Sequence, residues 1–301
     1  MNILQANPLV SVLMNCYNAS SFIERAVQSV IEQDYKNWEL IIWDDGSTDK
    51  TPQILKKIKD ERVKIFFANK NCGLGISRIK AAEQIKGDLV TVLDSDDYIH
   101  HTKLQKQVEI FLKNPQISLC TTWVKIYDEN SKLKKKFQSD LNNDELRRKL
   151  IFINTIPNSS TMYKKEGAKK IGWYSNLYEY SQDYDLSLKL TKNKELFLIK
   201  EFLTNITDHK TNMSRLDKYS HLRIKENIEI LKNNLKINNL TKREIKLIRD
   251  IISINYIKLH LNILKKDFMG SIIKILWILI KNPTLLFKIK ILRNLNEIII
   301  L

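Results

Sequence analysis

The first 125 residues alternate short apolar runs with segments in which apolar residues recur every three or four positions. The apolar runs predict buried strands at residues 9–14, 38–43, 63–67, 89–93 and 117–124. The segments between them predict helices that begin after Ser21, at Thr51, at Gly75 and just before Leu104. Strands that alternate with crossover helices form a parallel sheet. The pattern therefore predicts an α/β fold with a doubly wound, mostly parallel sheet.

Two of the predicted helix starts carry specific signals. Ser21 is followed three residues later by Glu24, the spacing of a capping box in which both side chains bind backbone N–H groups. Thr51 is followed by Pro52, and proline is favoured in the first turn of a helix.

The periodicity changes after the last of these strands. Residues 126–150 are polar and rich in lysine, which predicts a surface excursion, and residues 151–210 indicate short mixed elements. From Asp217 to the end the pattern is helical and basic, and residues 201–301 hold 19 Lys and Arg against 9 Asp and Glu. The chain therefore ends in a basic helical region.

The composition excludes several classes of protein. With 43% hydrophobic and 28% charged residues the chain is neither disordered nor fibrous. Cys16, Cys72 and Cys120 form no C-x-x-C pair, which argues against structural zinc and for a reducing, cytoplasmic compartment. We see no signal peptide and no run of about 18 apolar residues. The net charge of +16 comes without a nucleic-acid-binding motif, so we expect no nucleic-acid partner.

Polar residues gather where the predicted strands end, and the carboxyl ends of parallel strands meet at one edge of the sheet. The residues expected at this edge are Asn15, Tyr17, Asp44, Asp45, Arg78, Asp94, Ser95, Asp96 and Asp97. So many carboxylates repel one another unless a cation lies between them. Carboxylate oxygens suit Mg²⁺ or Mn²⁺, which usually keep waters and bridge to substrate phosphates.

Other interpretations of these strand ends stay open. An acidic loop can simply stabilise the N-terminus of the helix that follows it. A dinucleotide-binding fold needs glycines in the turn after the first strand, and residues 15–20 contain none. A sugar nucleotidyltransferase is the closer enzymatic alternative, although it would need a glycine-rich basic loop there. A non-catalytic scaffold that binds glycan or lipid is the alternative that is not an enzyme.

Four segments in this order resemble the family-2 glycosyltransferases. They are Val10–Asn18, Ile42–Asp49, Asn71–Gly73 with Arg78, and Leu93–Asp97. The resemblance covers about residues 8–210. It implies a GT-A fold and an inverting transferase that moves a sugar from a nucleotide-sugar, with UDP favoured, to an acceptor hydroxyl. Lipopolysaccharide, capsule and glycoprotein synthesis are the implied settings.

The resemblance also implies residue roles. Tyr17 would stack on the nucleobase, Asp45 would bond it, Asn15 and Asp44 would line the same pocket, and Arg78 would approach the phosphates. The acidic D-x-D segment Asp94, Ser95 and Asp96 would contact the ribose and a divalent metal, Mn²⁺ or Mg²⁺. Asp97 would be a further metal ligand. His209 is another candidate ligand, although a lone histidine is more often structural.

The implied general base is Asp183, at the N-terminal end of a predicted helix whose dipole favours a negative charge. Asp183 could instead be an N-terminal capping acid. Gln182 and Lys189 stand where the family often has Glu and Arg, which leaves Asp185 as an alternative base. A segment at Ser159 resembles an acceptor-side strand.

These expectations divide the chain into a catalytic domain, residues 1–215, and a basic helical region, residues 216–301. The catalytic domain would have a nucleotide-binding half at about 8–125 and an acceptor half at about 126–215. Lys274, Lys281 and Lys288 recur every seven residues around Trp277, which suits an anionic membrane surface and a lipid-linked or other glycan acceptor. A helical subdomain packed on the sheet, or an oligomer interface, is the alternative.

Overall fold

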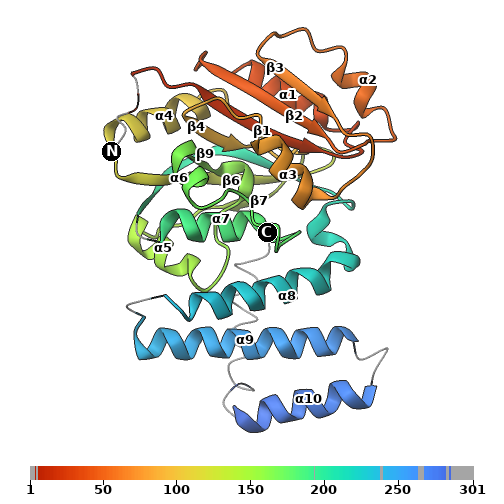
Figure 1. Cartoon of the computed structure of the whole chain (residues 1–301), viewed down its shortest axis with the longest axis vertical. Helices are drawn as coiled ribbons and strands as arrows, with labels where there is room; N and C mark the ends of the chain where they lie inside the picture. Colours follow the sequence, from red (N-terminus) through yellow and green to blue (C-terminus); the bar gives the residue numbers. More distant parts are fainter. Residues whose placement is uncertain are drawn as a thin grey trace. The chain divides into compact units, whose positions relative to one another are not determined.

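The computed structural model describes residues 4, 6–192, 194–237, 240–263, 268–282 and 285. The chain separates into two compact units (Figure 1). Unit 1 comprises residues 1–147 and 156–209, and unit 2 comprises residues 148–155 and 210–301.

Unit 1 is built on one mixed sheet of nine strands among its described residues. The strands are β1 (Val10–Cys16), β2 (Trp38–Asp44), β3 (Val63–Phe67), β4 (Leu89–Val92), β5 (Tyr98–Ile99), β6 (Ile117–Asp128), β7 (Leu133–Phe137), β8 (Met162–Lys164) and β9 (Glu195–Asp208). Their order is β3-β2-β1-β4-β8-β6-β9-β5, with β7 paired to β6 (Figure 1).

The helices lie between these strands and after them. Those that begin in unit 1 are α1 (Ile23–Ile31), α2 (Thr51–Leu55), α3 (Leu74–Ala82), α4 (Lys103–Lys113), α5 (Asn143–Leu150), α6 (Lys165–Lys170) and α7 (Gln182–Thr191), with a short 3₁₀ turn at Asn158–Ser160. Unit 2 contains a 3₁₀ turn at Met213–Arg215 and helices α8 (Asp217–Asn234), α9 (Lys242–Ile263) and α10 (Phe268–Lys281). Most of the described residues between 217 and 282 are therefore helical, as the pattern predicts.

The first four strands of the sheet order are parallel, which confirms the doubly wound half of the prediction. β1 pairs with β2 on one side and with β4 on the other, and Cys16 lies opposite Asp44. β2 and β4 therefore lie on the two sides of β1, and the carboxyl ends of these strands lie at the same edge of the sheet. Ligands of open α/β sheets bind where strand order reverses in this way.

The second half of the sheet is mixed. β8 runs antiparallel between β4 and β6, whereas the long β9 runs parallel to β6 and antiparallel to β5. The predicted excursion at residues 126–150 is a surface hairpin, because β6 continues to Asp128 and pairs with the exposed β7 before α5 begins.

The capping box predicted for α1 is wrong. The helix begins at Ile23, and Phe22 is its N-cap without a side-chain capping bond. The preceding turn is held by another loop instead, since Ala19 N–H donates to Thr51 Oγ1 at 2.8 Å and Ser20 N–H to Asp49 Oδ2 at 3.1 Å. Contacts distant in sequence thus replace the local cap.

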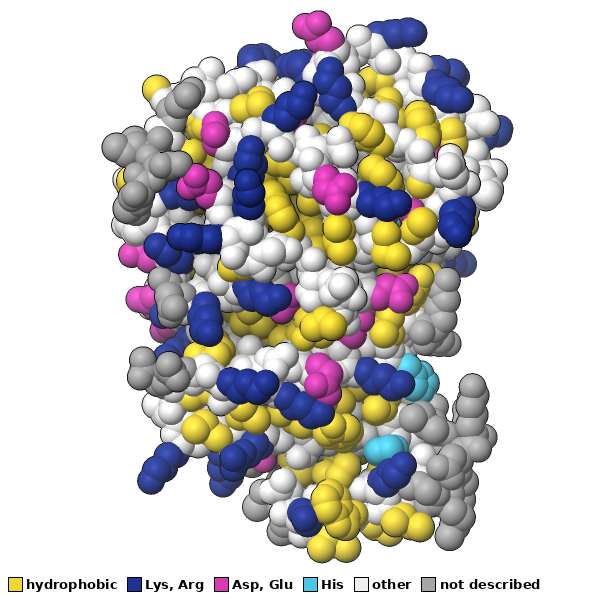
Figure 2. All heavy atoms as spheres, viewed as in Figure 1, with side chains coloured by type: hydrophobic (Ala, Val, Ile, Leu, Met, Phe, Trp, Pro, Cys, Tyr) yellow, Lys and Arg dark blue, Asp and Glu magenta, His cyan; other side chains and the backbone are white. Residues whose placement is uncertain are grey.

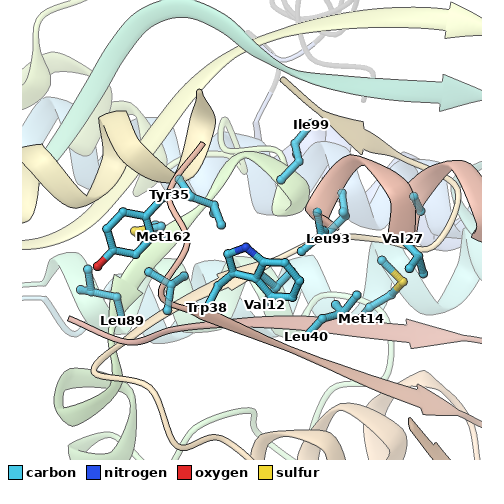
Figure 3. Close-up of a cluster of buried hydrophobic side chains, with 14 of the residues drawn as sticks. Val12, Met14, Val27, Tyr35, Trp38, Leu40, Leu89, Leu93, Ile99 and Met162 are labelled. Atoms are coloured by element: carbon cyan, nitrogen blue, oxygen red, sulfur yellow. The ribbon is translucent and has the colours of Figure 1, made fainter. Parts of the chain in front are cut away.

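The main core of unit 1 lies around the parallel strands. Apolar side chains of β1, β2 and β4 meet those of α1 and α4, and Figure 3 shows Trp38 at the centre of this cluster. Trp38 is 2% exposed, and the Arg62 guanidinium carbon lies 3.7 Å from its ring centroid. Such packing makes the parallel strands a rigid support for the loops at their ends.

One cation lies inside this core. Lys103, in the first turn of α4, is fully buried and donates from Nζ to Thr91 Oγ1 at 2.9 Å. Thr91 in turn donates to the carbonyl of Thr161 at 2.6 Å. Burial lowers the pKa of Lys103 to about 7, because the charged form loses its hydration.

Unit 2 has its own small core. Ile224 and Ile228 of α8 pack with Leu259 of α9, and the partly buried Tyr256 covers them. Arg148 forms an ion pair with Glu244. None of the helices within the described ranges is long and apolar enough to cross a membrane. Lys288 lies outside the described residues, so the predicted seven-residue lysine repeat is traceable only at Lys274 and Lys281.

We expect Lys103→Met to stabilise the protein at pH 7 and below. The lysine pKa is lower in the folded chain than in the unfolded chain, so between about pH 7 and 10 only the unfolded chain binds this proton. Stability of the native protein should therefore rise with pH across that window, and the variant should lose this rise. At pH 6.5 the variant should melt about 4 °C higher, which corresponds to ~1–2 kcal/mol.

Thermal melts from pH 6 to 10 measure both effects, with Lys113→Met as the control because Lys113 is exposed on the same helix. A Lys103→Met variant that melts lower than the native protein at every pH would show instead that the ammonium group stabilises the core.

Candidate functional site

The turn after β1 is built without glycine, and an asparagine takes its place. Asn18 has φ 52°, a left-handed conformation that asparagine tolerates better than most residues. Its Oδ1 accepts from the N–H of Thr48 at 2.8 Å and of Asp49 at 3.3 Å, and its own N–H donates to Ser47 Oγ at 2.8 Å. The neighbouring Tyr17 is left 49% exposed. An aromatic face thus stands open at the carboxyl edge of the sheet.

The two aspartates that end β2 are buried and bind backbone. Asp44 accepts from Ser47 N–H at 3.1 Å. Asp45 is 3% exposed and accepts from the N–H of Cys72 at 3.1 Å and of Gly73 at 2.9 Å. Burial raises the pKa of Asp45, while those two N–H groups oppose the rise. Asp45 therefore fixes the loop that enters α3.

That loop also depends on a close approach at Gly46. Gly46 has φ 74°, and a Cβ there would lie 2.7 Å from the carbonyl carbon of Lys70. Only glycine allows both the positive φ and this close approach, because it has no Cβ. The turn after β2 can therefore pack directly against the loop before α3.

Arg78 of α3 brings a buried cation to the same edge. It is 5% exposed, its Nη2 lies 3.7 Å from Asp94 Oδ1, and its guanidinium carbon lies 5.8 Å from the Tyr174 ring centroid. The buried Nη1 of Arg78 and Nδ2 of Asn15 have no hydrogen-bond partner among the described residues. Buried donors without acceptors are costly, so both groups fit an anionic or polar ligand.

The acidic loop, residues 94–97, is fixed by hydrogen bonds from the second half of the sheet. Asp94 N–H donates to Ser159 Oγ at 3.1 Å, and its Oδ1 accepts from Asn158 Nδ2 at 2.9 Å. Asp97 is buried, with Oδ2 accepting from Ser159 Oγ at 2.5 Å and Oδ1 from Thr207 N–H at 3.0 Å. Both oxygens of Asp97 are thus engaged within the protein.

Asp96 faces a histidine instead. Its Oδ2 lies 3.0 Å from Nε2 of His209, whose ring stacks on Phe22 with centroids 4.4 Å apart. The carbonyl of Asp96 accepts from Thr207 Oγ1 at 2.5 Å and from Arg25 Nη2 at 3.4 Å. The Asp96 side chain remains 24% exposed. The Asp96 carboxylate and the His209 imidazole therefore form a hydrogen-bonded pair at the acidic loop.

Burial and neighbouring charges raise the pKa values of Asp94 and Asp97. Burial raises the pKa of Asp94 to about 6; Arg78 opposes this rise, and the charges of Asp96 and Asp183 add to it. Because 41% of the Asp94 side chain is exposed, water offsets part of the effect. Burial, with Asp96 and Asp94, also raises the pKa of Asp97 well above its usual range. A cation at this edge would relieve the repulsion.

Asp183 lies close enough to take part in this field. Its charge contributes, after burial, to the raised pKa values of both Asp94 and Tyr174. It lies in the first turn of α7, at the positive end of the helix dipole. Asp183 is partly exposed, so it can meet a substrate.

Two residues near Asp183 on α7, Gln182 and the alternative base Asp185, make contacts within the protein. Gln182 is fully buried and donates to the carbonyls of Ser175 at 2.8 Å and Gly75 at 3.3 Å. Asp185 is 8% exposed and pairs with Lys189 Nζ at 2.6 Å. The side chains of Gln182 and Asp185 are therefore both engaged within the protein.

Arg78 and His209 contact the acidic loop, and Asp183 lies close enough for its charge to raise the pKa of Asp94. Tyr17 and the β2 aspartates lie at the ends of the adjoining strands. Ser95 is half-buried within the acidic loop, and Ser160 bonds Thr121 inside the core. Sequence reasoning assigned no role to several residues that shape the site, namely Asn18, Phe22, Arg25, Asn158 and Thr207. Only Asn18, a residue tolerant of positive φ in a turn without glycine, gave a local signal.

Comparisons with known proteins agree with this architecture. A profile described as Glycosyl transferase family 2 matches residues 11–172. An uncharacterised glycosyltransferase of Methanocaldococcus jannaschii is 32% identical over 230 residues, which covers 72% of this chain and 79% of the relative. A UDP-Glc:α-D-GlcNAc-diphosphoundecaprenol β-1,3-glucosyltransferase of Escherichia coli is 36% identical over 123 residues, or 41% of this chain and 48% of that protein.

Other curated relatives are matched over less than half of their length, 44% and 43% for two of them. Among solved structures, Staphylococcus aureus TarS 1-349 in complex with UDP-GlcNAc has a TM-score of 0.66 at 18% identity, covering 90% of this chain and 79% of that one. The mannosyltransferase PcManGT of Pyrobaculum calidifontis, in complex with GDP-Man and Mn²⁺, has a TM-score of 0.60 at 14% identity, covering 93% and 76%. Both show the fold.

We expect Ser159→Ala to destabilise the protein by about 1–3 kcal/mol. The substitution leaves the buried Asp97 Oδ2 without its donor and Asp94 N–H without its acceptor. Ser95→Ala, in the same loop, should change the free energy of unfolding by less than about 0.5 kcal/mol. Urea unfolding of the two variants decides the matter, and equal values would show that Ser159 does not hold the acidic loop.

Proposed function

Because the chain belongs to glycosyl transferase family 2, we propose that it is an inverting transferase that moves a sugar from a UDP-sugar to an acceptor hydroxyl. The observation that carries this proposal is the pairing of an acidic loop with a buried arginine that has a donor to spare, at the carboxyl edge of the parallel strands. Such an edge can hold a nucleoside diphosphate and offset the charge that develops as it departs.

The donor nucleotide would lie against the ends of β1 and β2. We assign base stacking to the exposed ring of Tyr17. The Asp45 carboxylate already binds two backbone N–H groups, and its remaining lone pairs could accept from a base N–H. Asn15 would use its unpartnered Nδ2, with Asp44 lining the pocket, and Arg78 would use its spare Nη1 on the diphosphate.

A divalent ion fits the donor set at the acidic loop. Asp96 and His209 would hold it, Asp94 would contact the ribose or the ion, and Asp97 would fix the loop because both its oxygens are engaged. No group of three metal-ligating side chains occurs in the part of the chain that the structure describes. This suits Mn²⁺ or Mg²⁺, which take much of their coordination from water and phosphate. The ion would supply positive charge beside the leaving diphosphate.

Asp183 is the proposed general base. It would take the proton from the acceptor hydroxyl as that oxygen attacks the anomeric carbon from the face opposite the diphosphate. One displacement of this kind inverts the configuration and needs no covalent intermediate. Arg78 would hold the diphosphate in position for displacement. The buried Tyr174, whose ring lies beside Arg78 and near Asp94 and Asp183, would exclude water from this part of the site.

The acceptor and the setting are proposed from the chemistry of a relative and from the cysteines. A relative acts on diphosphoundecaprenol-linked GlcNAc, so we propose a lipid-linked acceptor in the synthesis of a bacterial surface polysaccharide. Cys16, Cys72 and Cys120 are all free thiols, which fits the cytoplasmic face of a membrane. Residues 1–215 would carry catalysis, with the donor in about 8–125 and the acceptor in about 126–215.

We expect Asp183→Asn to lower kcat at least 10²-fold while the Kd for UDP changes by less than about threefold, because only proton removal is lost. The matched variant is Asp185→Asn on the same helix. It breaks the ion pair with Lys189, so it should act mainly by lowering the melting temperature and not by lowering kcat. Sugar transfer and UDP titration separate the two effects. Full turnover by Asp183→Asn would place the base elsewhere.

We expect Asp96→Asn and His209→Ala each to raise the Mn²⁺ concentration for half-maximal binding of Mn²⁺–UDP at least tenfold, since each removes a proposed ligand. The pair Asp34 and His101, at 2.9 Å on the surface, provides the control, and Asp34→Asn should leave Mn²⁺ affinity unchanged. Calorimetry with Mn²⁺ and UDP measures this. Unchanged Mn²⁺ affinity in both site variants would rule out the proposed ligands.

A further inference from the structure

One face of α10 exposes large apolar side chains to solvent. Ile273 is 60% exposed, Leu276 52%, Trp277 58% and Ile280 77%. These four residues, which we call the α10 apolar face, follow the spacing i, i+3, i+4 and i+7 and so form one stripe along the helix. In Figure 2, hydrophobic side chains gather at the bottom of the view, over the end of the chain that carries α10.

The opposite side of the helix is buried within unit 2. Ser271 is 1% exposed, and α10 packs beside α9. The α10 apolar face is therefore distinct from the side of the helix that packs into the core of unit 2. Exposed apolar stripes of this kind mark interaction surfaces.

The flanks of the stripe indicate what it contacts. Lys274 and Lys281 lie seven residues apart on one side of the stripe, both exposed, and Lys281 Nζ lies 4.1 Å from the Trp277 ring centroid. Lysine is depleted at the centres of protein interfaces, whereas lysine beside tryptophan on an amphipathic helix suits the headgroup layer of a membrane. Residues 201–301 carry more than twice as many basic as acidic side chains, which adds attraction to anionic lipid.

We propose that the α10 apolar face docks on a membrane surface that contains anionic lipids. The helix would lie in the plane of the interface, with Ile273, Trp277 and Ile280 between the headgroups and the two lysines at the phosphates. This proposal rests on the proposed function for its purpose: it would hold the enzyme where a lipid-linked acceptor is embedded.

Flotation of the full chain with liposomes tests the docking without any substrate. We expect binding to vesicles of 70% phosphatidylcholine and 30% phosphatidylglycerol, and at least tenfold weaker binding by Trp277→Ser/Ile280→Ser. Lys274→Gln/Lys281→Gln should bind anionic vesicles several-fold more weakly. Leu133→Ser, which removes an exposed apolar side chain from β7, and Lys50→Gln/Lys57→Gln, which removes two exposed charges, should bind like the native chain.

Three results would overturn the proposal. The first is no binding by the native chain, or equal binding by the native chain and Trp277→Ser/Ile280→Ser. The second is a fall in oligomer mass of that variant by light scattering with vesicle binding unchanged, because the face would then join two copies. The third is a lower melting temperature with binding unchanged, because the chain itself would then cover the face.

Hydrolysis of UDP-sugars in solution with Mn²⁺ is measured in parallel and should be unchanged in the α10 variants. Loss of vesicle binding therefore leaves the transferase proposal standing, and loss of hydrolysis in the native chain leaves the docking proposal standing.

Discussion

The crowding of carboxylates at one edge of the parallel strands is the constraint on which the rest of the structure depends. Asp94, Asp96 and Asp97 follow one strand, and burial, together with their mutual repulsion, raises the pKa values of Asp94 and Asp97. The fold holds them there with hydrogen bonds from Ser159 and Thr207. A site that keeps like charges together at this cost is suited to a positively charged ligand and the phosphates that accompany it.

The strand ends of this site were predictable because local patterns mark them. β1, β2 and β4 are short apolar runs, and each ends in polar residues, so Tyr17, Asp44 and Asp94 could be placed at one edge without a structure. The hydrogen bonds that fix this edge could not be predicted from local patterns. Thr207 and His209 lie more than 100 positions from the acidic loop, and their contacts depend on how β9 pairs with β6 and β5.

Local signals also misled where tertiary contacts were stronger. Ser21 and Glu24 have the spacing of a capping box, yet the helix starts later because the turn before it is bound by Asp49 and Thr51. The Lys-rich β7 shows no alternation of apolar and polar residues, and pairing with β6 alone makes it a strand. In both cases a backbone hydrogen bond to a distant segment decided the conformation.

Lys103 and Arg78 are both buried cations of unit 1, but the groups around them differ. Lys103 donates to a hydroxyl group in the core, and burial moves its pKa toward neutrality, so its charge is the costly form there. Arg78 is nearly as buried, but a guanidinium is a permanent cation, and it faces the Asp94 carboxylate with one donor left over. Of these two buried cations, the permanent one is therefore the one that a carboxylate balances. Its Nη1 donor suits an anionic or polar ligand, because no group among the described residues accepts from it.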